Sequence, residues 1–80
     1  MGLRLHSQFL DALALLSPSD QKRVRAAVQQ LGNGELTRGL RSHPVGDFMS
    51  FSATMDLRIL AVGEPAGYAL VHVGHHDDVY

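Results

Sequence analysis

The sequence predicts an α+β fold in which a helical hairpin packs on one face of an antiparallel sheet. Apolar residues recur at helical spacing in two segments of the first 32 residues. Glycine and asparagine at 32–34 end this helical part, and runs rich in Leu, Val and Ile follow from about residue 48. The expected order is therefore one strand, two helices and three strands.

The composition fits a small globular protein. Eighty residues, 45% of them hydrophobic and 19% charged, predict one soluble domain over residues 1–80. The absence of cysteine excludes disulfides, thiolate metal sites and cysteine nucleophiles. A net charge of −1 gives no sign of a general nucleic-acid binder. There is neither a signal peptide nor a run of the ~20 apolar residues that span a bilayer, so we expect a cytoplasmic protein without membrane contact.

A change in the spacing of apolar residues predicts the first strand and the first helix. Gly2–His6 alternates apolar and polar residues, as a strand with one buried face does. Ser7 is a good N-cap, because its hydroxyl can accept a bond from a free backbone N–H. Phe9 and the leucines after it then recur at helical spacing, which predicts a helix over Gln8–Leu16.

The second helix has the clearest start signal in the chain. Ser17 can act as the N-cap, Pro18 suits the first helical position, and Asp20 lies where a capping box places its acidic residue. Gly32 ends the helix. Its core stripe is Val24, Ala27, Val28 and Leu31.

The second half of the chain predicts strands. Residues 35–47 contain two glycines and a proline and indicate a long connection, with one helical turn around Glu35–Leu40. Five turn-forming residues, Gly63–Gly67, separate two apolar runs and favour a hairpin. The expected strands are Phe48–Ser52, Asp56–Val62 and Tyr68–Val73. The positions expected to form the core are Phe9, Leu13, Leu16, Val24, Val28, Leu31, Leu57, Ile59, Leu70 and Val71.

A group of imidazoles and carboxylates ends the chain: His72, His75, His76, Asp77 and Asp78. These are good ligands for divalent ions, but side chains along a strand alternate between faces, so the neighbouring histidines diverge. We therefore expect no metal site. There is also no Gly-x-Ser-x-Gly turn and no glycine-rich phosphate loop, and no cofactor is expected.

Arg58 interrupts the most hydrophobic strand, between Leu57 and Ile59. Two interpretations are open: alternation simply turns Arg58 to solvent, or the outer sheet face is a binding surface where its guanidinium meets a phosphate. His76 and Tyr80 follow the end of the next strand. Arginine, imidazole and phenol together can serve phosphodiester cleavage.

The same residues carry a resemblance to a known family. Arg58-Ile59-Leu60 followed by Val73-Gly74-His75-His76-Asp77-Asp78-Val79-Tyr80 resembles the C-terminal motif of the RelE/ParE superfamily of bacterial toxins. The order of strands and helices and the Leu-Ser-Pro-Ser-Asp-Gln helix start fit the same family more loosely. The resemblance spans nearly the whole chain, and the C-terminal motif is its specific part.

The resemblance implies one of two activities. RelE-type members cut messenger RNA on the ribosome without a metal, by attack of a 2′-oxygen on the adjacent phosphate, whereas ParE-type members poison DNA gyrase. Both kinds imply a cognate antitoxin. For the RelE type, Arg58 corresponds to the arginine that stabilises the phosphate, His76 to the acid–base position and Tyr80 to the terminal aromatic. The residues that would contact RNA are Lys22, Arg23, Arg25 and His75. The general base stays open among Glu35, His43 and His75.

Three features depart from a potent nuclease of this type. The net charge of −1 is low for a protein that lies against ribosomal RNA. Asp77 and Asp78 would repel the substrate phosphate, and no charged tail follows Tyr80. A non-nuclease member therefore stays open, either a gyrase-directed toxin or an accessory domain beside a DNA helicase. The end at Tyr80 fits equally a natural terminus or a truncation.

Overall fold

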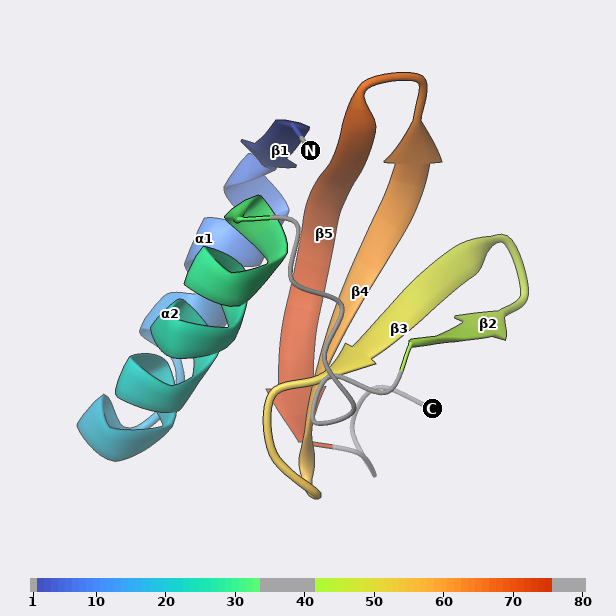
Figure 1. Cartoon of the computed structure of the whole chain (residues 1–80). Helices are drawn as coiled ribbons and strands as arrows, with labels where there is room; N and C mark the ends of the chain where they lie inside the picture. Colours follow the sequence, from blue (N-terminus) through green and yellow to red (C-terminus); the bar gives the residue numbers. More distant parts are fainter. Residues whose placement is uncertain (1, 34–41, 76–80) are drawn as a thin grey trace.

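The computed structural model describes residues 2–33 and 42–75, and in these ranges it contains a sheet with two helices packed against it (Figure 1). The strands are β1 (Gly2–Leu5), β2 (His43–Val45), β3 (Phe48–Ser52), β4 (Leu57–Glu64) and β5 (Gly67–His75), and the helices are α1 (Ser7–Ala14) and α2 (Pro18–Gly32). α1 packs along β5, α2 contacts β1 and β4, and both helices lie away from β2. The expected α+β class is confirmed.

The sheet is mixed, with the order β1-β5-β4-β3-β2. β3, β4 and β5 form the antiparallel part that the sequence predicts, and β2 extends it by one further antiparallel strand. β1 lies parallel to β5, with Leu5 opposite Leu70. A parallel neighbour needs a long connection, and β1 and β5 are separated by the rest of the described chain. Local sequence patterns carry no information on such a distant pairing.

One strand lies where a connection was expected. β2 occupies the end of the 35–47 segment and pairs with β3, Val45 opposite Phe48. Three residues are too few to show alternation, and Pro44 normally argues against a strand. Here the proline is tolerated because β2 is the edge of the sheet. The helical turn expected at Glu35–Leu40 falls within 34–41, outside the described residues.

Both ends of α1 differ from the expectation of Ser7 as cap and Leu16 as end. His6 is the N-cap: its ring Nδ1 accepts a hydrogen bond from the Gln8 N–H at 3.1 Å. A ring nitrogen therefore replaces the expected hydroxyl. The helix ends at Ala14, because the next two amides turn back to Ala12 and Leu13 in a tighter turn that leads directly into α2.

α2 begins as the sequence predicts. The Ser17 Oγ accepts from the Asp20 N–H at 3.2 Å, Pro18 is the first helical residue, and the helix runs to Gly32. Neither described helix has the length and apolar character that crossing a membrane would require.

The core lies between the helices and one face of the sheet. Most of the expected positions are buried there: Phe9, Val24, Leu31, Leu57, Ile59 and Leu70. Three others, Leu13, Leu16 and Val28, are half-buried and pack against this core. Val71 is the exception, since a bulge places Leu60 opposite His72 and Ala61 opposite Leu70, so that Val73 occupies the core in its place.

Candidate functional site

Arg58 lies on the face of the sheet opposite the core. Its neighbours Leu57 and Ile59 are both buried in the core, so alternation turns Arg58 outward, as both interpretations require. In the ladder it stands between Ser52 of β3 and Gly74 of β5.

The guanidinium is fixed by backbone carbonyls and is not freely solvated. Arg58 Nη1 donates to the Thr54 carbonyl at 2.8 Å and to the Leu57 carbonyl at 3.4 Å. The Arg58 Nε is buried and has no hydrogen-bond partner within the described part of the chain. The side chain is therefore held in one orientation with a donor that is not satisfied by its surroundings.

The turn between β3 and β4, residues 53–56, holds this orientation. Thr54 Oγ1 accepts from the N–H groups of Asp56 at 3.2 Å and Leu57 at 3.0 Å. The Ala53 N–H donates to the Leu57 carbonyl at 3.0 Å. A threonine side chain thus closes the turn by replacing backbone partners. The carbonyl of the same threonine is the one that holds Arg58.

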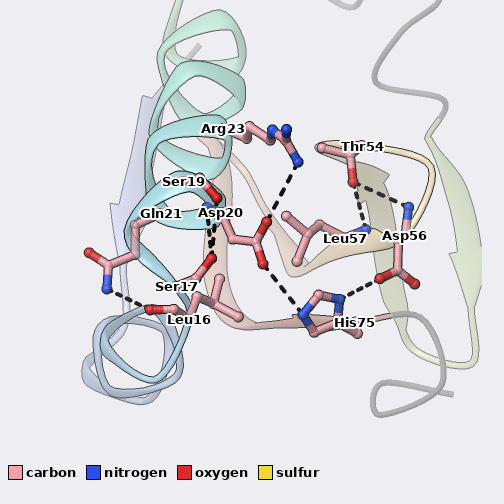
Figure 2. A network of polar contacts seen from close by, with 10 residues as sticks. All are labelled: Leu16, Ser17, Ser19, Asp20, Gln21, Arg23, Thr54, Asp56, Leu57 and His75. Atoms are coloured by element: carbon pink, nitrogen blue, oxygen red, sulfur yellow. Dashed lines mark hydrogen bonds and ion pairs between the residues drawn. The ribbon is translucent and has the colours of Figure 1, made fainter.

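His75 lies at the end of β5 between two carboxylates that come from different elements (Figure 2). Its Nδ1 contacts Asp56 of the turn, and its Nε2 lies 3.5 Å from Asp20 Oδ2 of α2. Asp20 is also 3.7 Å from the Arg23 guanidinium. The His75 side chain is 43% exposed. A network of polar contacts therefore joins the start of α2, the 53–56 turn and the end of β5.

The basic residues of α2 form a solvent-exposed cluster, as the sequence predicts. Arg23 makes the ion pair with Asp20 just described, and Arg25 donates to the Gln21 side-chain oxygen at 3.3 Å. Lys22 is exposed on the same helix. The structure thus leaves the positive groups of Lys22 and Arg25 without a carboxylate partner in the described residues.

A groove of about 370 Å³ lies where the α1–α2 connection faces the second half of β5. Its apolar wall includes Leu15, which is 88% exposed, and Leu16. His72 and His75 line the opposite wall, with Asp20 at the edge on α2. The groove therefore combines an exposed leucine with groups that can form hydrogen bonds.

Several expected site residues cannot be placed. His76, Tyr80 and the candidate base Glu35 lie outside the described residues. His43 starts β2 at the far edge of the sheet, separated from β5 by two strands. Within residues 2–33 and 42–75, no group of three or more histidines and carboxylates is arranged to hold a metal ion.

Two residues of the site were not singled out from the sequence. Thr54 and Asp56 lie in a turn between two strands, and Ala53–Asp56 contains no glycine or proline to draw attention to it. A threonine three positions ahead of a buried strand, placed where its hydroxyl can accept from the amides that follow, is the signal that was available.

The fold of this chain is similar to that of solved structures, although its sequence matches no known family. No protein-family profile matches the sequence, and no curated protein matches it. Solved structures do. A chain of the DinJ-YafQ complex from E. coli aligns with a TM-score of 0.81 at 14% identity, over 99% of this chain and 97% of that one. A chain of the RelB-RelE antitoxin-toxin complex from Methanococcus jannaschii gives 0.77 at 14% identity, over 96% and 94%.

A third similar structure is a metal-bound toxin from Helicobacter pylori, with a TM-score of 0.77 at 20% identity over 100% of this chain and 99% of that one. The alignments cover nearly the whole of each chain, so the overall architecture of this chain is similar to that of these three. The chain has the RelE-like fold, and the resemblance drawn from Arg58-Ile59-Leu60 and the C-terminal motif is confirmed at the level of the fold.

Proposed function

We propose that this chain is the toxin of a toxin–antitoxin pair and that it cleaves messenger RNA on the ribosome. The toxin half of the proposal is supported by the fold, since the similar structures include chains from the complexes named DinJ-YafQ and RelB-RelE. The nuclease half rests on one observation, the guanidinium of Arg58 held on the outer sheet face with a buried Nε that has no partner among residues 2–33 and 42–75.

The chemistry of that observation favours an anion. A buried donor without a partner costs about 1–3 kcal/mol, and a fold retains such a group where a function needs it. A phosphate that accepts from Nε and Nη2 at once would satisfy the guanidinium with two parallel bonds. Arg58 would then stabilise the charge that develops on the phosphate during attack by the 2′-oxygen.

The other proposed roles complete the reaction. His76 is the proton donor to the departing 5′-oxygen, because an imidazole exchanges protons near neutral pH. Tyr80 positions a base by stacking or by a hydrogen bond. The exposed amines and guanidinium groups of Lys22, Arg23 and Arg25 contact ribosomal RNA. These events take place in the cytoplasm.

The proposed partner outside the ribosome is a cognate antitoxin. The groove beside β5 exposes Leu15 to solvent, next to Ala12 and Leu16, and this apolar wall offers a surface that a partner segment can cover. An antitoxin segment that fills this groove and extends over Arg58 and the basic cluster of α2 would neutralise the toxin. Co-purification from the native host at low salt with no small partner would count against this arrangement.

The proposed function is tested by induced expression in a bacterial host. The wild-type chain should arrest growth and produce new transcript ends within open reading frames. Arg58→Ala should abolish both effects, since a group aimed at developing charge contributes about 10²–10³ in rate. His76→Gln should lower cleavage at neutral pH. Arg4→Ala is the matched control, because Arg4 is an exposed arginine at the other end of the sheet and should leave the arrest unchanged.

Two results would contradict the nuclease. Growth arrest that is unchanged in both the Arg58 and the His76 variants would indicate a different target, and gyrase supercoiling assays would then test the gyrase-directed alternative. No arrest by the wild-type chain, in cells where the folded protein accumulates, would remove the toxin itself and favour an accessory domain.

A further inference from the structure

Both ring nitrogens of His75 contact carboxylates, and these two contacts together favour the protonated imidazole. Asp56 lies at Nδ1 and Asp20 at Nε2. A carboxylate can only accept a hydrogen bond, and a neutral imidazole has one N–H to give. The imidazolium carries an N–H on each nitrogen, so it can donate to Asp56 from Nδ1 while its charge attracts the Asp20 carboxylate, 3.5 Å from Nε2.

The same contacts place His75 and Arg58 on opposite faces of one ladder. His75 stands opposite Leu57, whose side chain is in the core, whereas Arg58 points to the outer face. The 53–56 turn reaches both faces, with the Asp56 carboxylate on His75 and the Thr54 carbonyl on Arg58. Thr54 Oγ1 joins the two by accepting from the Asp56 N–H.

We propose that His75 is a positioning residue that fixes Arg58 through Asp56 and Thr54. The imidazolium holds the 53–56 turn against α2 (Figure 2). The turn held in this way presents the Thr54 carbonyl to Arg58 Nη1 in one orientation. The link between His75 and Arg58 is a property of the fold. Its consequence for RNA cleavage rests on the proposed function.

This role differs from the RNA contact that the resemblance implies for His75. A cation that contacts a phosphate needs an unmatched positive charge, whereas the His75 ring has a carboxylate on each side. The position is better suited to hold the turn than to attract RNA. Lys22 and Arg25 keep their exposed charges for that purpose.

The proposal predicts a pH dependence, which depends on the charged groups around His75. Asp20 and Arg23 face it from α2, and Asp56 faces it from the turn. Within β5 the nearest titratable group is His72, three residues earlier. His76, Asp77 and Asp78 follow in the sequence and lie outside the described residues. When His75 loses its proton, it loses the charge attraction to both carboxylates, and the turn should loosen.

The test follows the Arg58 Nε–H by NMR in the full chain. In the wild-type protein, this resonance should shift with pH at the same midpoint as the imidazole carbons of His75. His75→Gln should remove that pH dependence and speed exchange of the Arg58 Hε with water by about tenfold, a factor that one charge-assisted hydrogen bond typically contributes. Asp56→Asn should uncouple the two titrations while His75 still titrates.

Two controls separate this link from general effects. Asp11→Asn removes an exposed carboxylate of α1 and should leave the Arg58 resonance unchanged. His72→Gln should preserve the coupled titration. An Arg58 resonance that stays constant while His75 titrates in the wild-type chain overturns the proposal, and so does an unchanged resonance in His75→Gln. The wild-type titration decides the matter even where a variant does not fold.

The two proposals fail in different ways. If the wild-type chain cleaves no RNA, the proposed function is wrong, and the Arg58 resonance still decides whether His75 positions the guanidinium. If the chain cleaves RNA and His75→Gln leaves both kcat and its pH profile unchanged, the positioning role is wrong and the nuclease stands. The expected result is a lower kcat in His75→Gln with KM unchanged.

Discussion

The two ends of the β4–β5 ladder are built in different ways. At the hairpin end, Gly63–Gly67, the geometry depends on the backbone, and the ion pair between Arg4 and Glu64 there is exposed to solvent. At the open end, side chains from three elements converge on His75, and the turn beside them holds Arg58. In this ladder, therefore, the backbone at the hairpin end sets the strand register, and side chains at the open end build the candidate site.

The hairpin end also starts the pairing of β1. The Gly2 N–H donates to the Ala66 carbonyl at 2.8 Å, and Gly2 stands opposite Gly67 in the parallel register. The connecting turn is Pro65–Ala66, shorter than the five residues that the sequence favoured, because both strands extend further toward it. Close backbone contact at this point leaves little space for side chains.

Among substitutions at the two ends of the ladder, Gly67→Ala should lower the free energy of unfolding the most. Gly67 has a φ of +153°, and a Cβ there would lie 1.8 Å from the Gly2 carbonyl oxygen. Strained backbone together with this clash should cost about 3 kcal/mol or more. Chemical denaturation measures the loss. Gly63→Ala is the matched control, since a Cβ at that glycine meets nothing within 4 Å. Equal stability of the two variants would show that β1 does not pair here.

Thr54→Val should weaken the open end by a smaller amount. Valine keeps the shape and the branched Cβ but leaves the Asp56 and Leu57 amides without the oxygen that they donate to. The expected loss of unfolding free energy is about 1–3 kcal/mol. Thr54→Ser retains the oxygen and should recover most of it. The Arg58 Nε–H resonance should move in the valine variant and stay in place in Gly63→Ala, because only the first change touches the turn.

Ser17→Ala should lower the free energy of unfolding by a still smaller amount, about 1 kcal/mol, which is the usual contribution of an N-cap. The cap lies at the open end, where it begins the helix that carries Asp20. Ser7→Ala is the informative control, because the sequence favours Ser7 as a cap and the structure gives that role to His6. A thermal melt should therefore show a loss for Ser17→Ala and almost none for Ser7→Ala. The reverse order would mean that the start of α1 is assigned wrongly.

These residues show how much the sequence could predict. The start of α2 was predictable because a serine, a proline and an aspartate act within one turn of chain. The outward direction of Arg58 followed from alternation with two buried neighbours. The parallel pairing of β1, the bulge beside Val71 and the clamp at His75 were not predictable. Each depends on contacts between residues far apart in the chain, which one sequence does not record.

Loss of the Arg4–Glu64 pair should lower the free energy of unfolding the least, and the loss should depend on pH. Arg4 donates to both oxygens of Glu64, from Nη2 at 2.7 Å and from Nε at 3.3 Å. This hydrogen bonding lowers the pKa of Glu64. A lowered carboxyl pKa adds stability above the unfolded value of about 4.3, and that stability is lost as the pH falls through the folded pKa. Because the pair is exposed, its contribution is small and screened by salt.

Glu64→Gln isolates this contribution. Its unfolding midpoint should lie slightly below that of the wild type at neutral pH, and the two should converge at acid pH, where Glu64 is protonated in both states of the wild-type chain. High salt should reduce the neutral-pH difference. The Arg58 resonance should not respond to this substitution, since Glu64 lies at the hairpin end of β4. If the difference in unfolding midpoint between the variant and the wild type grows as the pH falls, the pKa of Glu64 is raised by folding and not lowered. A shifted Arg58 resonance would show that the two ends of the ladder are coupled.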